Sequence, residues 1–354
     1  MAQTFLHLDP ATINGNVKAE IRSNHADLVD IGCDIGIVRF KPIVFCHAVM
    51  LLGQFPHRFG YDLSMYLSTV NVFFERTTQD GFIVIGDGSA DFKKRMAEDL
   101  GVGLASLFMV RGLRLKWKTI AQIPTNGKLS RYRPDFLGFT ENDQRYIYEA
   151  KGTTQANKLE EAMVKALKQS KSYSDQALAK FAIASYFPSS GKQLPPFTFV
   201  ADPPIAALFP PERRLAIMLH YVNVLEYCGF QRTRIAYEAL LVEVFAFERK
   251  GESLARLSYR PYPIKEKVNE VSKSYESEGP ATFAWRERVF VGRYLTAKQG
   301  DRVASVFLGV DKEHIERILR LEVETPESED IAFEGTDESI SIFSDGTIIR
   351  VGPS

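Results

Sequence analysis

The sequence predicts an α/β fold, and three observations carry this prediction. Apolar residues recur with a helical period over residues 91–110. Runs rich in Tyr, Phe, Leu and Ile, which are typical of strands, follow up to residue 153. An amphipathic helix at residues 155–173 then leads into two further strand-type runs. The expected order from Asp91 to the first of these two runs is therefore helix, strand, strand, strand, helix and strand.

Length and composition fit a soluble protein of two or three compact units. The chain has 354 residues, of which 45% are hydrophobic and 25% charged. We expect a mixed N-terminal region at residues 1–85, the α/β core at 86–205, and an α+β C-terminal region at 206–354. The formal net charge is zero, so any binding of nucleic acid has to rest on local basic patches.

Nothing in the sequence points to secretion or to a membrane. The N-terminus lacks the basic-then-apolar pattern of a signal peptide. The longest apolar run, residues 43–52, is too short to span a bilayer. The three cysteines are widely spaced, which favours buried thiols in a reducing compartment over disulfides or a zinc site. We therefore expect a cytoplasmic protein with no membrane partner.

The N-terminal region offers elements but no recognisable chemistry. Residues 30–38 are strand-like, and residues 44–55 have helical character. Residues 70–76 and 82–85 are typical of two strands around a turn at 79–81. The histidines of this region lack ligand spacing on a common helix face, so we expect them to be structural.

The helix expected at residues 91–110 has two apolar stripes. Glu98 falls on the second stripe, one turn before Val102. A carboxylate on a buried stripe is costly unless it is paired or binds a metal. The alternative is an exposed acid near the start of the helix, where the helix dipole favours it.

A basic segment connects this helix to the next strands. Residues 114–123 alternate between apolar and polar side chains, which predicts a strand with Arg114, Lys116 and Lys118 on one face. From residue 111 to residue 133 every charged residue is basic: Arg111, Arg114, Lys116, Lys118, Lys128, Arg131 and Arg133. The segment suits contact with a phosphate backbone. The alternative is a solvated sheet face.

Residues 131–153 form the expected centre of the core. Two strand-type runs flank polar turn residues at 141–143, which predicts a hairpin. Glu149 and Lys151 share one face because side chains alternate along a strand, and the hairpin can bring Asp135 to the same face. Two carboxylates and an ammonium at one point suit phosphodiester hydrolysis. Carboxylate oxygens bind Mg²⁺, and a lysine offsets the charge that develops on the phosphate.

The spacing Pro134-Asp135, thirteen residues, then Glu149-Ala150-Lys151 resembles the signature of the PD-(D/E)XK nuclease superfamily. The expected order of elements resembles the restriction-endonuclease-like αβββαβ core of that superfamily. The resemblance implies that Asp135 and Glu149 hold Mg²⁺, with Mn²⁺ as a substitute. It also implies that the Ala150 carbonyl adds a ligand and that Lys151 serves the attacking water.

Two helices extend the resemblance. An acid on the first core helix often completes the metal site in this superfamily, which implies Glu98, with Asp99 as the competing candidate. On the second helix, Gln169 and Tyr173 lie four residues apart and resemble an additional motif of the RecB-type branch. In that branch the Gln and the Tyr are linked to the active site and the substrate. Ordinary helix packing is the alternative explanation of this pair.

The C-terminal region mixes helices and strands. Residues 212–227 and 234–248 are expected to form helices, and residues 258–280 a loop. Residues 283–295 are strand-like, with arginines between aromatic residues. Residues 339–351 should close the chain as a hairpin around Asp345-Gly346.

An acidic segment precedes that hairpin. Residues 322–338 contain eight acids and no basic residue: Glu322, Glu324, Glu327, Glu329, Asp330, Glu334, Asp337 and Glu338. One interpretation is a flexible solvated linker. The sharper one is that the segment competes for the basic groove or recruits a protein partner.

The sequence thus predicts a Mg²⁺-dependent nuclease, and an endonuclease that acts on DNA is favoured. Antiviral defence, restriction and repair are the biological processes expected for it. Two alternatives stay open. One is a nucleic-acid-binding or scaffolding protein that keeps the fold without catalysis, and the other is an RNA-cleaving nuclease. The sequence also leaves the subunit number open, a homo-oligomer included.

Overall fold

The computed structural model divides the chain into two compact units. The described residues are 2–6, 37–53, 85, 89–123, 135–172, 179–188, 197–201, 213–248, 262–299, 302–323, 329–335 and 338–353. The first unit comprises Met1–Arg213 with Ala297–Val303, and the second comprises Arg214–Thr296 with Ala304–Ser354. The expected boundary near residue 205 lies close to this division, whereas residues 1–85 and 86–205 fall in one unit. The strand expected at 70–76 and its turn lie outside the described residues.

The first unit is built on a seven-stranded mixed sheet. Its strand order is β2-β1-β7-β6-β5-β4-β3. The bounds are β1 Ala2–Leu6, β2 Ile37–Phe40, β3 Ala121–Gln122, β4 Phe136–Phe139, β5 Arg145–Thr153, β6 Ala179–Tyr186 and β7 Phe197–Ala201. β5 runs parallel to β6 and β1 runs parallel to β7, while the other neighbours are antiparallel. With the helices described next, this sheet confirms the expected α/β class.

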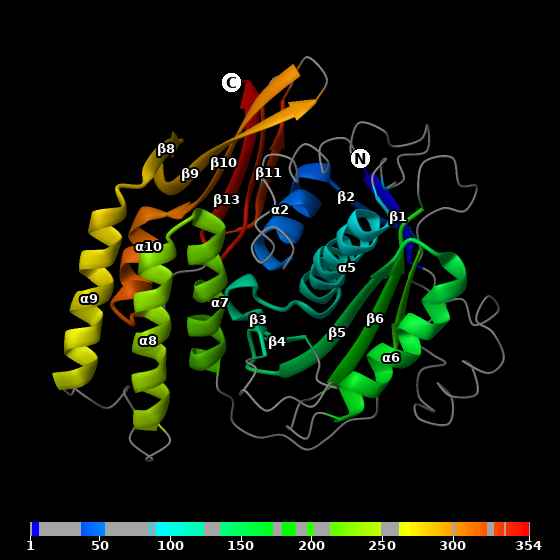
Figure 1. Ribbon diagram of the computed structural model, residues 1–354, viewed down its shortest axis with the longest axis horizontal. Helices are drawn as coiled ribbons and strands as arrows, with labels where there is room; N and C mark the ends of the chain where they lie inside the picture. Colours follow the sequence, from blue (N-terminus) through cyan, green and yellow to red (C-terminus); the bar gives the residue numbers. More distant parts are fainter. Residues whose placement is uncertain are drawn as a thin grey trace. The chain divides into compact units, whose positions relative to one another are not determined.

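Helices cover both faces of this sheet (Figure 1). The bounds are α2 Pro42–Leu52, α5 Ala90–Leu113, η2 Trp117–Thr119, η3 Ala156–Lys158 and α6 Leu159–Ser172. The order α5, β3, β4, β5, α6, β6 is the one expected. α2 confirms residues 44–52 of the helix expected at 44–55; Gly53 follows the end of the helix, and 54–55 lie outside the described residues. α5 begins where the Ser89 hydroxyl accepts a hydrogen bond from the Phe92 N–H at 3.2 Å.

Strand periodicity assigns the two long helices to opposite faces of the sheet. Tyr148 points to α5, because its hydroxyl hydrogen-bonds Ser106 of that helix at 2.9 Å. Glu149 and Lys151 point the other way, to the face on which the apolar side of α6 packs against Ala182 and other β6 residues. The site residues therefore lie on the α6 face of β5.

The expected strand at residues 114–123 is wrong for most of its length. Arg114 has a φ of 58° and ends α5, Leu115 forms a single bridge to Thr140, and a 3₁₀ helix follows at Trp117–Thr119. The Thr119 hydroxyl accepts from the Phe139 N–H at 2.9 Å, and its one proton has two acceptors in reach, the Lys116 carbonyl at 2.7 Å and the Phe139 carbonyl at 3.0 Å. This side chain therefore occupies the hydrogen-bonding groups of β4 that a continuous strand would have used.

In its described residues, the second unit contains a six-stranded sheet and four α-helices. The strand order is β11-β12-β13-β10-β9-β8. The bounds are α7 Arg213–Cys228, α8 Gln231–Glu248, α9 Tyr262–Glu278, β8 Ala281–Trp285, β9 Arg288–Gln299, β10 Arg302–Asp311, α10 Lys312–Leu319, β11 Ile331–Glu334, β12 Ser339–Ile342 and β13 Thr347–Pro353. The two expected helices are confirmed as α7 and α8, and the closing hairpin as β12 and β13. The expected loop at 258–280 is instead largely helix α9, and the expected strand at 283–295 is split by a turn at Arg286, whose φ is 54°.

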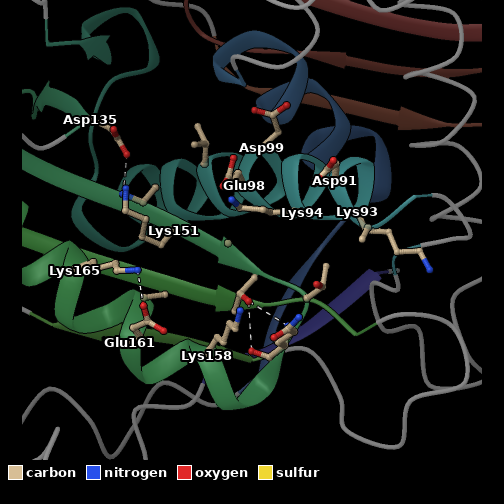
Figure 2. Close-up of a pocket in the computed structure, with 18 of the residues that line it drawn as sticks. Asp91, Lys93, Lys94, Glu98, Asp99, Asp135, Lys151, Lys158, Glu161 and Lys165 are labelled. Carbon is tan, nitrogen blue, oxygen red and sulfur yellow. Dashed lines mark hydrogen bonds and ion pairs between the residues drawn. The ribbon is translucent and has the colours of Figure 1, made fainter. Parts of the chain in front are cut away.

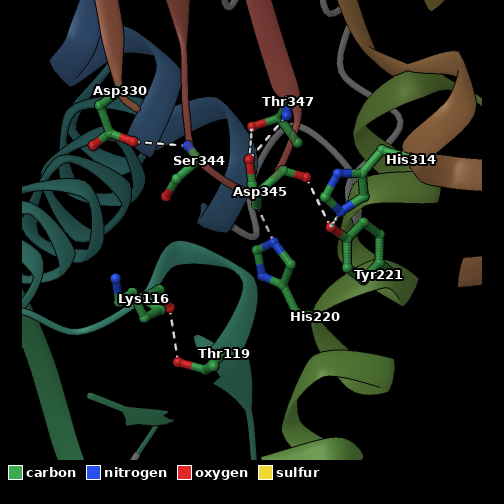
Figure 3. A network of polar contacts seen from close by, with 9 residues as sticks. All are labelled: Lys116, Thr119, His220, Tyr221, His314, Asp330, Ser344, Asp345 and Thr347. Atoms are coloured by element: carbon green, nitrogen blue, oxygen red, sulfur yellow. Dashed lines mark hydrogen bonds and ion pairs between the residues drawn. The ribbon is translucent and has the colours of Figure 1, made fainter. Parts of the chain in front are cut away.

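A buried polar network fastens the closing hairpin of this unit (Figure 3). His220 of α7 lies 2.7 Å from the Asp345 carboxylate, which also accepts from the N–H and the hydroxyl of Thr347 at 2.9 and 2.6 Å. The Tyr221 hydroxyl donates to the Asp345 carbonyl at 2.7 Å and lies 2.6 Å from His314 of α10. The turn is thus tied to two helices by satisfied polar groups.

Much of the acidic segment that the structure describes is bonded within the second unit. Part of it is strand β11, which pairs with β12. Glu338 forms an ion pair with Arg350 at 2.5 Å, Glu322 lies 3.3 Å from Arg320, and Asp330 accepts from the Ser344 N–H at 2.7 Å. A wholly flexible linker is therefore a wrong description of these residues, and the role in binding a partner or the basic groove stays a prediction.

Candidate active site

The β4–β5 hairpin brings Asp135, Glu149 and Lys151 together. Phe136 pairs with Tyr148 in the antiparallel register, and their rings stack with centroids 5.2 Å apart. Asp135, one residue before this pair, therefore stands opposite Glu149. The Asp135 carboxylate accepts from the Ala150 N–H at 3.4 Å, and the Lys151 ammonium forms an ion pair with Glu149.

These residues lie at the edge of β5, where β5 extends beyond β4. Among the described residues, β4 pairs only with positions 145–148 of β5, while β6 pairs with positions 146–153 on the other side. The Ala150 N–H points to this open edge, and the Ala150 carbonyl points the same way, because both groups of one strand residue face one side. The edge therefore offers a backbone oxygen beside the Asp135 carboxylate.

A cavity of about 780 Å³ opens along this edge (Figure 2). Asp135, Ala150 and Lys151 line it, together with residues of α5 and α6. Glu149 is not among the lining residues. It is fully buried and reaches the site through its contact with the Lys151 ammonium.

The pKa of Glu149 is raised to about 9. Burial is the largest cause, the nearby charge of Asp135 adds to it, and the Lys151 ammonium only partly opposes them. Among the described residues, neither Glu149 oxygen has a hydrogen bond of ordinary geometry beside that ion pair. The site is therefore short of positive charge at Glu149.

Lys151 keeps its charge in this setting. Burial lowers the pKa of its ammonium, but the charges of Asp135 and Glu149 outweigh burial and raise the pKa above its ordinary value. In the metal-free protein its ammonium is therefore a hydrogen-bond donor and a positive charge.

The two candidate acids of α5 have different surroundings. Glu98 is exposed and lines the cavity, so its expected place on a buried stripe is wrong. Its charge nevertheless acts on Lys151. Asp99 also lines the cavity, but it is buried against Gly53 at the end of α2, and Figure 2 shows its carboxylate turned away from Lys151. Of the two acids, Glu98 is the one directed to the site.

The donor set at this edge fits a hard divalent cation. In the part of the chain that the structure describes, no group of three or more His, Cys, Asp and Glu side chains is arranged to hold a metal. Mg²⁺, however, commonly binds one or two carboxylates and keeps several waters. Asp135 and the Ala150 carbonyl offer such oxygen ligands at the cavity wall, and the buried Glu149, whose oxygens are poorly satisfied, lies next to them.

The expected nucleic-acid contacts are only partly gathered here. Gln169 lines the cavity, whereas Arg114, Lys116 and Lys118 do not. Lys116 lies 3.7 Å from Glu141, near the turn of the hairpin. Lys118 is 6% exposed, so the predicted basic face of three solvated side chains is wrong. Arg131, Arg133 and Tyr173 lie outside the described residues.

Four other lysines line the cavity instead, namely Lys93, Lys94, Lys158 and Lys165. They come from the first turns of α5, from η3 and from α6. Their sequence signal is weak because lysines are common on exposed helix faces. Only the packing of both helices beside the end of β5 brings them to one place.

Comparison of this chain with models of protein families, with curated proteins and with solved structures gave no significant match. None of the described helices combines the length and the apolar character that a membrane span requires.

Proposed function

We propose that this chain is a metal-dependent nuclease of the PD-(D/E)XK type. The observation that carries the proposal is the meeting of Asp135, Glu149 and Lys151 at the open edge of β5, beside a cavity. The order of elements from α5 to β6 supports it, because that order resembles the restriction-endonuclease-like αβββαβ core. DNA is the favoured substrate, and cleavage within the strand the favoured mode.

Each site residue has a distinct role in this proposal. Asp135 and Glu149 would hold Mg²⁺ or Mn²⁺, the Ala150 carbonyl would add a ligand, and Glu98 would take part from the cavity side. The bound ion would polarise the phosphoryl oxygen and make water a better nucleophile. The Lys151 ammonium donates hydrogen bonds to the attacking water or to a phosphate oxygen, and it offsets negative charge as that charge develops.

Cleavage assays on the purified protein test the proposal. Supercoiled, linear and single-stranded DNA, and matched RNA, are incubated with Mg²⁺, with Mn²⁺ or with a chelator. We expect metal-dependent cleavage that falls at least 100-fold in Asp135→Asn and in Lys151→Ala. Glu141→Gln is the matched control, because it removes an exposed carboxylate from the turn of the same hairpin. Undiminished cleavage by both site variants would overturn the proposal.

A nucleic-acid-binding protein without catalysis is the second candidate. The raised pKa of Glu149 favours it, since a protonated carboxyl is a poor metal ligand at neutral pH. This candidate predicts binding of nucleic acid without turnover in either metal. If RNA alone is cleaved, the nuclease proposal stands with its substrate changed.

A further inference from the structure

The cavity contains further charged side chains besides Asp135 and Lys151, and two of them are Lys94 and Lys158. Lys94 lies on α5 one helical turn before Glu98, and Lys158 is the last residue of η3, directly before α6. Both line the cavity. Figure 2 shows Lys94 extending from α5 toward Glu98 and Lys151, while Lys158 lies at the start of α6. The two ammonium groups thus approach one cavity from two elements.

Within the described residues, neither of these lysines forms an ion pair. The other lysines of the cavity include two that do: Lys165 is held by Glu161 at 2.5 Å, and Lys151 contacts Glu149. An unpaired ammonium keeps all three of its donors for an external anion.

The position of Lys158 separates it from the reacting phosphate. β5 ends at Thr153, four residues beyond Glu149, which is about 13 Å in an extended strand. Lys158 follows that end of the strand. A polyanionic chain whose reacting phosphate lies at Asp135 would therefore bring a different phosphate to Lys158.

We infer that Lys94 and Lys158 clamp a phosphate that neighbours the one being cleaved, so that the substrate is an extended nucleic-acid strand. The inference rests on the proposed function, because it names how the same cavity holds its substrate. Both lysines are positioning residues, since neither is among the groups assigned to the metal or to the attacking water. Their effect should lie in binding and in KM.

Binding without metal tests the clamp independently of cleavage. Fluorescence anisotropy is measured with labelled 16-nucleotide DNA and RNA strands, in a chelator and at several KCl concentrations. It gives the affinity and its salt dependence. We expect Lys94→Gln/Lys158→Gln to bind about 10-fold more weakly. The slope of log K against log [KCl] is negative, and its magnitude should decrease by about one, since each phosphate contact contributes about 0.7 to 0.9.

The matched control is Lys265→Gln/Lys273→Gln, which removes two exposed lysines of α9 that do not line the cavity. We expect this variant to bind like the wild type. If the two double variants had equal affinities and equal slopes, the clamp would be overturned, whether both bound more weakly than the wild type or both bound like it. Circular dichroism melts confirm that each variant is folded before the comparison.

Kinetics distinguish a failed clamp from a failed nuclease. If the wild type cleaves DNA or RNA, the clamp predicts a KM raised about 10-fold with little change in kcat. Cleavage with an unchanged KM would reject the clamp and leave the proposed function intact. If the wild type cleaves neither strand in any metal but its binding depends on the two lysines, the clamp stands as a binding site and the nuclease proposal fails.

Discussion

Glu149 is a carboxyl group placed where its ionised form is unstable. It is fully buried, the charge of Asp135 lies nearby, and the Lys151 ammonium balances it only in part. Its pKa is consequently about 9, against an ordinary value of 4.5. A side chain that destabilises the fold in this way is typical of functional sites. A divalent cation beside it would lower this pKa and remove the penalty.

The first prediction concerns the stability of the metal-free protein. Because the folded pKa of Glu149 is raised, the favourable contribution of its protonated form is complete below about pH 4.5 and is lost as the pH rises through 9. Glu149→Gln removes this loss. At pH 8 in a chelator we expect its free energy of unfolding to exceed that of the wild type by a few kcal/mol, since each pKa unit is worth about 1.4 kcal/mol, so that it unfolds at a higher temperature.

Melting curves between pH 5 and pH 9 measure this difference. The advantage of Glu149→Gln should shrink toward pH 5 and should be absent in Glu141→Gln. A wild type more stable than Glu149→Gln at pH 8 without metal would contradict the raised pKa assigned to Glu149.

At the scale of elements, the site depends on how closely α5 approaches β5. A Cβ on Gly152 would overlap the Ala97 carbonyl of α5, and a Cβ on Gly101 would crowd the backbone of Lys151 and Gly152. The two glycines therefore let helix and strand backbones meet. This contact brings the exposed Glu98 beside the end of β5.

The second prediction follows from this contact. Gly152→Ala should force α5 away from β5 and destabilise the first unit by about 2 kcal/mol or more, with loss of any cleavage. Gly112→Ala is the control, because its added Cβ would meet nothing closer than 3.6 Å. In a helix it should be neutral or stabilising by up to about 1 kcal/mol. Thermal unfolding of both variants checks the pair, and equal stabilities would contradict the close approach.

The hairpin at the centre of the site was predictable because its signals are local. Alternation places Glu149 and Lys151 on one face, and turn residues close the loop so that Asp135 returns to that face. The lysines of the cavity were not predictable in this way. Lys94 and Lys158 line one cavity only because α5 and α6 pack beside the same end of β5. That packing is a tertiary property.

Two predictions of secondary structure, the strand at 114–123 and the loop at 258–280, were wrong for identifiable reasons. The alternation at residues 114–123 correctly marks buried side chains such as Leu115 and Trp117, but the Thr119 hydroxyl replaces strand pairing with a 3₁₀ turn. For α9, the prolines near residue 262 suggested a loop. Pro263 lies in the first helical turn, where proline is tolerated. The spacing of the buried residues Ile264, Val268, Val271 and Tyr275 is that of a helix.

At the scale of the whole molecule, the chain consists of two units, and the second contains a fully buried contact between Asp345 and His220. Burial alone would raise the pKa of Asp345, yet its hydrogen bonds to His220 and Thr347 outweigh burial and lower the pKa below the ordinary value of 3.8. The stability from this group is therefore present above pH 3.8 and is lost as the pH falls through the lowered pKa.

The third prediction uses that network. Asp345→Asn should destabilise the second unit by about 3 kcal/mol between pH 5 and pH 8, because breaking one partner of a buried pair leaves the other unsatisfied. Glu276→Gln, on an exposed position of α9, should change stability by less than about 0.5 kcal/mol. Urea unfolding followed by circular dichroism compares them, and equal midpoints would remove the structural role given to Asp345.

The most direct measurement is titration of the protein with Mn²⁺ at pH 8, followed by electron paramagnetic resonance of the free ion. We predict one Mn²⁺ bound per chain in the wild type and in Glu141→Gln, with affinity reduced at least 10-fold in Asp135→Asn and in Glu149→Gln. Equal Mn²⁺ binding by all four proteins, or none by the wild type, would contradict a divalent-cation site at the edge of β5.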